Sequence, residues 1–155
     1  MRRAISLTRS VAVLAVGALV VAGAGACSSA PPAPGAAAGV LAAGLAAGDL
    51  ADVALTGATA TEATKQLSAA VAGLKPMQPV VTVGKVVLDK KGAAATAALG
   101  YTWDLDAPGE NWTYTTTAHL TLVKDRWTVK WTPFLIAPDL LAGETLGLHL
   151  SLIHI

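Results

Sequence analysis

The sequence contains one cysteine, Cys27, and this scarcity excludes several kinds of site. Without a second cysteine the chain cannot form an internal disulfide, and it cannot build a thiolate metal cluster. The three histidines, His119, His149 and His154, do not show the spacing of metal ligands. The sequence therefore predicts neither a metal site nor a cofactor.

Charged residues are also scarce, at 14% of the chain. Three of the eleven basic residues, Arg2, Arg3 and Arg9, precede an apolar N-terminal run, which leaves eight basic against ten acidic side chains in the rest of the chain. That remainder contains no basic run or stripe, and its absence argues against a nucleic acid as partner.

The N-terminus has the order of a secretory signal. The three arginines precede an apolar run over residues 11–25, and Ala26 and Cys27 follow it. A cysteine directly after small residues is typical of a bacterial lipoprotein, in which cleavage precedes the cysteine and diacylglycerol is attached to its sulfur. We therefore predict a signal peptide over residues 1–26 and a lipid on Cys27. The protein would be anchored at the extracytoplasmic face of the cell membrane.

An uncleaved signal anchor is the alternative to lipidation. The apolar run is shorter than the roughly 20 residues that a spanning helix needs, although residues 4–7 could extend it. Ala24 stands three positions before the cysteine, where lipoproteins usually have leucine. The lipid anchor is favoured, and the signal anchor stays open.

Residues 27–38 are rich in serine, proline and alanine, which predicts a flexible linker. One domain is expected to follow over residues 39–149, with a first helix over residues 40–55 that Gly48 bends or ends.

A second helix is expected to be capped by Thr59 or Thr61 and to stop at Lys75-Pro76. Its apolar stripe consists of Leu67, Ala70, Val71 and Leu74.

From Pro79 onward the periodicity changes to that of strands. Strands are predicted over residues 80–89, 93–105, 111–123 and 126–132. Two helices followed by consecutive strands with short turns, one of them at residues 106–109, indicate an α+β fold. Both helices would pack on one face of a curved antiparallel sheet of about four strands.

All seven aromatic residues lie between Tyr101 and Phe134. Tyr101 and Trp103 are two residues apart, and so are Trp112 and Tyr114. This spacing places both members of each pair on one face of a strand. A structural aromatic core is therefore predicted from Tyr101, Trp103, Trp112, Tyr114, Trp127 and Trp131. A ligand pocket lined by these rings is the alternative.

Residues 125–140 read DRWTVKWTPFLIAPDL, and residues 141–146 read LAGETL. Together they resemble the closing strand and exit of the N-terminal domain of MecA-type class B penicillin-binding proteins, which is similar in fold to nuclear transport factor 2. Phe134 stands where the family has serine, and Ala137 where it has histidine. A lipidated N-terminus is common in actinobacterial members, so the resemblance is to the actinobacterial type.

The resemblance implies a role in peptidoglycan cross-linking and in the response to β-lactam antibiotics. In relatives a C-terminal transpeptidase domain performs this chemistry with the motifs Ser-x-x-Lys, Ser-x-Asn and Lys-Thr/Ser-Gly, and none of these motifs occurs in this chain. We expect the chain to be non-catalytic, a membrane-proximal spacer and docking domain. Its implied partners are the outer leaflet of the membrane, a missing transpeptidase domain, and peptidoglycan or proteins of the division or elongation machinery.

Residues 150–155 resemble a translated sequencing adapter, so we expect a chain truncated before the transpeptidase domain. Two other functions stay open. One is a complete cell-envelope lipoprotein that binds a small apolar ligand. The other is an isomerase-like enzyme of related fold, with Asp104, His119 and Tyr101 as candidate residues.

Overall fold

The computed structural model describes residues 32–105 and 111–148. The predicted signal peptide, Cys27, the turn at residues 106–109 and the predicted adapter scar lie outside the described residues. The elements in chain order are α1 (Pro34–Ala47), β1 (Leu55–Thr56), α2 (Ala60–Ala70), β2 (Val80–Leu88), β3 (Ala94–Asp104), β4 (Asn111–Val123), β5 (Arg126–Lys130) and the short 3-10 helix η1 (Pro133–Leu135).

The strands form one five-stranded sheet in the order β1-β5-β4-β3-β2. Strands β2 to β5 are antiparallel neighbours, while β1 pairs with β5 in parallel. The predicted α+β class is confirmed, and the sheet has one strand more than expected. Strand β1 was not predicted because it contains only Leu55 and Thr56. Two residues are too few to show the alternation of apolar and polar residues that identifies a strand.

The first helix begins earlier than the sequence pattern predicts. Pro34 occupies the first turn of α1, where its missing N–H costs nothing, and the following alanines have the highest helix propensity. The linker predicted over residues 27–38 therefore extends too far. Gly48 ends α1 in the left-handed conformation, with φ 73°, and its N–H donates to the carbonyl of Gly44.

The second helix begins as its capping residues predict. The Thr59 side chain accepts from the N–H of Glu62, and the Glu62 carboxylate accepts from the N–H of Thr59, which completes a capping box. The helix ends at Ala70, before the predicted stop at Lys75-Pro76. Soon after this end Gly73 forms a parallel bridge with Gly147, so the C-terminal segment pairs with residues that were expected to continue the helix.

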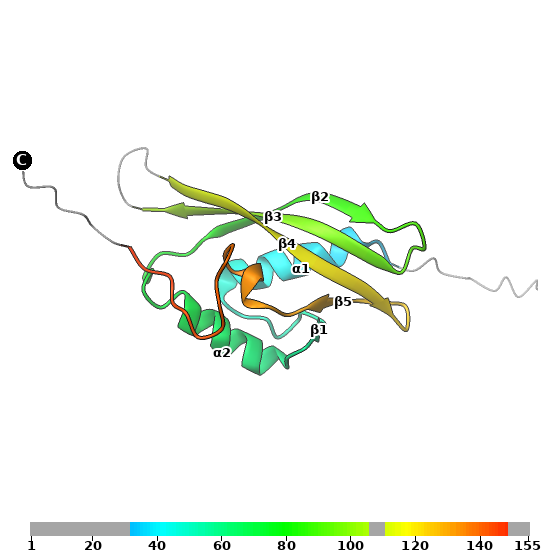
Figure 1. The fold of residues 1–155 in the computed structure, drawn as a ribbon, viewed down its shortest axis with the longest axis horizontal. Coiled ribbons are helices and arrows are strands. Elements are labelled where there is room, and N and C mark those ends of the chain that lie inside the picture. The colour runs from blue at the N-terminus through cyan, green and yellow to red at the C-terminus, as the bar shows by residue number, and fades with distance from the viewer. Residues whose placement is uncertain (1–31, 106–110, 149–155) are drawn as a thin grey trace, which may run out of the picture.

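The core lies between the helices and one face of the sheet (Figure 1). Alternate residues of β3 and β4 are buried, and their register sets Tyr101 opposite Tyr114 and Trp103 opposite Trp112. The other face of β4 is exposed and carries Thr113, Thr115, Thr117, His119 and Thr121. Strand β2 is irregular between Val83 and Val86, which locally disturbs the edge of the sheet.

No helix among the described residues has the length and the apolar character that crossing a membrane would require.

Candidate functional site: the aromatic end of the sheet and its pocket

Four aromatic rings gather at one end of the β3–β4 hairpin. The ring centroids of Tyr101 and Tyr114 lie 4.9 Å apart with the planes stacked at 13°. Those of Trp103 and Trp112 lie 6.4 Å apart, and Trp112 also packs on Tyr114 at 4.8 Å. Tyr101 and Trp103 are buried, while Trp112 and Tyr114 are half-buried. The period of two in the sequence, together with the cross-strand register, therefore produces one continuous stack of rings.

The polar ends of these rings hold η1 against the sheet. The Tyr101 hydroxyl donates to the carbonyl of Leu135 at 2.6 Å, and the Tyr114 hydroxyl donates to the carbonyl of Ile136 at 2.8 Å. The Trp103 indole N–H donates to the Tyr114 hydroxyl at 3.0 Å. Buried aromatic side chains with a polar atom require such partners, and here the same bonds fix the turn that follows β5.

Both tyrosines are held in the neutral form. Burial raises the pKa of Tyr114 to about 12, although the hydrogen bond from Trp103 partly opposes this rise. Burial also raises the pKa of Tyr101 above its ordinary value, and the neighbouring Tyr114 adds to the effect. The physical cause is desolvation, which disfavours the phenolate. These hydroxyls act as hydrogen-bond donors at neutral pH.

The two remaining tryptophans attach the sheet to the helices. The Trp127 indole N–H donates to the carbonyl of Pro32, just ahead of α1, at 2.6 Å. The Trp131 indole N–H donates to the side-chain oxygen of Gln66 on α2 at 2.7 Å. Both rings are buried. Each ring therefore combines burial of its apolar surface with a directed hydrogen bond to a distant segment.

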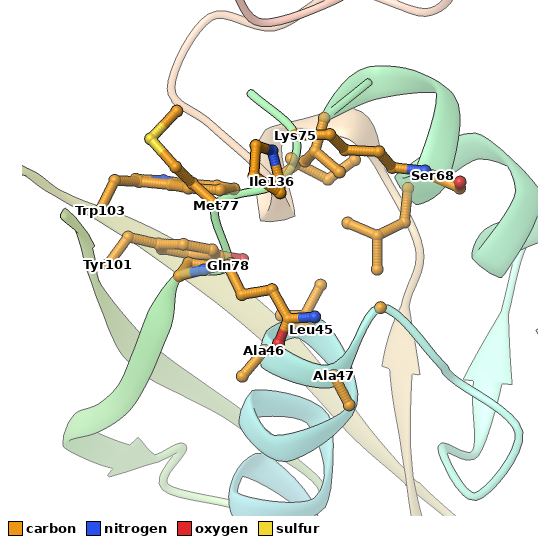
Figure 2. A pocket seen from close by; sticks show the side chains of 15 residues that line it. Leu45, Ala46, Ala47, Ser68, Lys75, Met77, Gln78, Tyr101, Trp103 and Ile136 are labelled. Atoms are coloured by element: carbon orange, nitrogen blue, oxygen red, sulfur yellow. The ribbon is translucent and has the colours of Figure 1, made fainter. Parts of the chain in front are cut away.

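A pocket of about 280 Å³ opens beside the aromatic stack, between α1, α2, β3 and the segment that connects α2 to β2. Figure 2 shows the rings of Tyr101 and Trp103 lying roughly parallel at one side, with Met77 above them and Leu45 and Ala46 below. Lys75 and Ser68 lie across the cavity from the rings. The volume is close to the lower end of the range for small-molecule pockets, roughly 300–1,000 Å³.

The candidate residues for an isomerase do not meet in this pocket. Tyr101 lines it, but its hydroxyl donates to the Leu135 carbonyl. His119 lies on the exposed face of β4, and Asp104 is an exposed residue at the end of β3. Neither residue lines the pocket, and none of the described residues that line it is Asp or Glu. The lining residues that the structure describes therefore supply no buried carboxylate of the kind that such an enzyme uses as its base.

Within the described part of the chain, no cluster of three or more His, Cys, Asp or Glu side chains could hold a metal ion.

Sequence reasoning found the rings of the pocket and missed its other wall. Lys75, Met77 and Gln78 belong to an irregular segment without a period, so nothing in the sequence assigns them to a face. Ile136 follows η1, and its position depends on the hydrogen bonds from the tyrosines. The sequence identifies Lys75-Pro76 as a helix stop. It does not indicate that these residues and Trp103 line the same pocket.

Two helices and a mixed, mostly antiparallel five-stranded sheet define an α+β domain. The family described as "MecA_N: NTF2-like N-terminal transpeptidase domain" matches residues 33–144. The chain belongs to this family, the N-terminal non-catalytic domain of penicillin-binding transpeptidases. The match is to the accessory domain, and no catalytic domain is detected in the chain.

No curated protein matches the chain. Among solved structures, the chain is similar to the intermembrane space region of the chloroplast protein ARC6. The two share 16% identity with a TM-score of 0.34, over 63% of this chain and 90% of the other.

Proposed function

We propose that this chain is the membrane-proximal spacer and docking module of a class B penicillin-binding protein of the actinobacterial type. A lipid on Cys27 holds it to the outer leaflet of the cell membrane, and a transpeptidase domain follows it in the complete protein. Family membership over residues 33–144 supports this assignment. The apolar run and the small residues ahead of Cys27 support the lipid anchor.

The observation that carries the spacer role is the path of the chain through the domain. In Figure 1, α1 begins near one end of the long axis, and the described chain leaves at the opposite end. A domain entered and left at opposite ends adds its long dimension to the separation between its two neighbours. This geometry suits a module that lifts a catalytic domain away from a membrane anchor.

The exit of the chain is also attached to the body of the domain. The N–H of Leu146 donates to the carbonyl of Ala70 at 2.6 Å, and Gly147 forms its bridge with Gly73. These contacts fix the direction in which the chain leaves the domain at residues 146–147. A spacer with a fixed exit positions its neighbour better than a flexible tether of equal length.

The docking role needs a surface, and the outer face of the sheet supplies a polar one. Threonines alternate along β4 on this face, and exposed threonine hydroxyls both donate and accept hydrogen bonds. Peptidoglycan, or a protein of the division or elongation machinery, is the proposed partner class.

The proposal is tested first on the gene. Genomic DNA read past the codon for Leu148 is expected to continue in frame to Ser-x-x-Lys, with natural sequence in place of the predicted adapter scar, and the complete product is expected to react with a fluorescent penicillin. The chain of 155 residues serves as the control and should stay unlabelled. A stop codon directly after Ile155 in intact genomic DNA would contradict the proposal.

The anchor is tested separately in cells. Globomycin should cause an unprocessed precursor to accumulate, and Cys27→Ala should prevent lipid attachment, whereas Ser29→Ala should be processed normally. If Cys27→Ala leaves both gel mobility and membrane retention unchanged, the uncleaved signal anchor is the correct alternative.

A further inference from the structure

The inner part of the pocket beside the aromatic stack is lined by buried apolar residues. Five buried residues line it: Leu45 of α1, Leu67 of α2, Tyr101 and Trp103 of β3, and Ile136 after η1. In Figure 2 the two aromatic rings lie at one side of the cavity, with Leu45 and Ala46 of α1 below them. A cavity lined by aromatic rings and aliphatic side chains suits a small apolar molecule.

The rim of the pocket is polar and exposed. Ser68, Lys75 and Gln78 line the pocket and are exposed, so their polar ends stay hydrated. Among the described residues that line the pocket, Lys75 is the one with a charge, and none is Asp or Glu. Charge complementarity at this rim therefore favours an acidic group on the molecule that enters.

The C-terminal end of α1 also reaches the pocket, through Ala47 and Gly48, and its effect has the opposite sign. A helix C-terminus acts as roughly half a negative charge, and the ammonium of Lys75 carries a full positive charge. Of these two charges, that of the lysine is the larger in magnitude, and it favours an acidic group on the ligand.

We propose that this pocket is a binding site for a small apolar molecule that carries an acidic group such as a carboxylate. The apolar part lies against Trp103 and Tyr101, and the acidic group lies at the rim beside Lys75 and Ser68. The volume of about 280 Å³ limits the ligand to about the size of a substituted bicyclic ring. The proposal does not depend on the spacer role, because it uses only residues within this domain.

The experiment uses the full chain held in lipid nanodiscs and labelled with fluorotryptophan. Its four tryptophans supply separate fluorine resonances, and only Trp103 lines this pocket. Trp127 and Trp131 hydrogen-bond to Pro32 and Gln66 and serve as internal references. The probes are 2-naphthoate, the neutral 2-naphthalenemethanol and the cationic 2-naphthylmethylamine.

Naphthoate is expected to shift the Trp103 resonance in a saturable way and to leave those of Trp127 and Trp131 in place. The neutral alcohol should bind about two- to fivefold more weakly, since an exposed ion pair contributes little, and the amine more weakly still. Lys75→Gln should make naphthoate and the alcohol bind equally. Equal or tighter binding of the amine to the unmodified chain would overturn the acidic class of ligand.

Variants that fill the cavity locate the site. Ala46→Phe on α1 and Ser68→Phe on α2 both place a ring in the pocket and should abolish the Trp103 shift. Ala43→Phe is the matched control, because Ala43 is an exposed residue of α1 that does not line the pocket, and it should bind naphthoate normally. The reference tryptophans report whether each variant is folded. A Trp103 shift that survives in either folded filled variant, or no Trp103 shift in the unmodified chain, would overturn the proposal.

Discussion

The indole N–H of Trp103 donates to the hydroxyl of Tyr114 at 3.0 Å, and that same hydroxyl donates to the carbonyl of Ile136 at 2.8 Å. Trp103 is fully buried, at 0% exposure, whereas Tyr114 is half-buried. A single phenol oxygen therefore satisfies a buried donor and at the same time holds the turn after β5. Tyr114 should therefore contribute more to the free energy of unfolding than its half-buried position indicates.

This relationship predicts that Tyr114→Phe destabilises the fold more than Tyr101→Phe does. Removing the Tyr114 hydroxyl leaves the Trp103 N–H buried without a partner, at a cost of about 1–3 kcal/mol. Removing the Tyr101 hydroxyl should cost about 0.5–1.5 kcal/mol, because the Leu135 carbonyl still accepts from Thr116 at 3.2 Å. Urea unfolding of the two variants provides the measurement. The opposite ranking would show that the Trp103 contact is not the decisive one.

The two tyrosines also predict a loss of stability in alkali. Burial raises the pKa of both, that of Tyr114 to about 12. Unfolding returns these pKa values to about 10, so the folded state holds more protons above that pH. The stability is fully present below about pH 10 and falls as the pH rises toward the folded pKa of Tyr114.

Tyrosinate absorbance and circular dichroism, followed together, check this alkaline prediction. The chain has only two tyrosines, so the absorbance reports on these residues alone. Ionisation should begin above the ordinary range for tyrosine and should accompany unfolding. Ionisation near the ordinary pKa with the fold intact would contradict the burial argument.

Trp131, which directly follows β5 and hydrogen-bonds to α2, should be essential for stability. Trp131→Ala removes a ring that is 7% exposed together with its hydrogen bond to Gln66, and we expect a loss of about 3–5 kcal/mol. Trp112→Ala is the matched control and should cost clearly less, because Trp112 is half-buried at the end of the stack. The midpoints of urea unfolding compare the two variants, and equal losses would count against this account.

The attachment of the exit segment depends on a glycine. A Cβ at Gly73 would meet the carbonyl oxygen of Leu146, whereas a Cβ at Gly147 would meet nothing nearby. We expect Gly73→Ala to displace the segment at a cost of about 1–3 kcal/mol and Gly147→Ala to be close to neutral. Hydrogen exchange at Leu146 should become faster in the first variant alone. Unchanged exchange in Gly73→Ala would show that the segment adapts without leaving α2.

Several elements could be predicted from local physical chemistry. The capping box at Thr59 and Glu62 and the alternation along β4 follow from residues that are neighbours in the sequence. The start of α1 was missed because alanine and proline are typical both of linkers and of a first helical turn. The end of α2 at Ala70 was missed because the C-terminal segment, distant in the sequence, pairs with Gly73.

The candidate site also has a part that follows from the local sequence and a part that depends on tertiary packing. A period of two was sufficient to place Tyr101 and Trp103 on one face of β3. The pocket itself also needs Leu45 from α1, Leu67 from α2 and the aperiodic residues near Lys75. No local pattern relates these segments, because their proximity results from the packing of the helices on the sheet.

The sequence by itself determined the α+β class, the inward face of the aromatic strands and the resemblance to the N-terminal transpeptidase domain. These properties depend on propensity, on periodicity and on a contiguous run of residues around Trp127 and Trp131. Only the tertiary structure decided where the rings place their polar atoms, where the chain leaves the domain and that a pocket opens beside Trp103. Those features arise from hydrogen bonds and packing between segments far apart in the chain, and such contacts exist only once the core has formed.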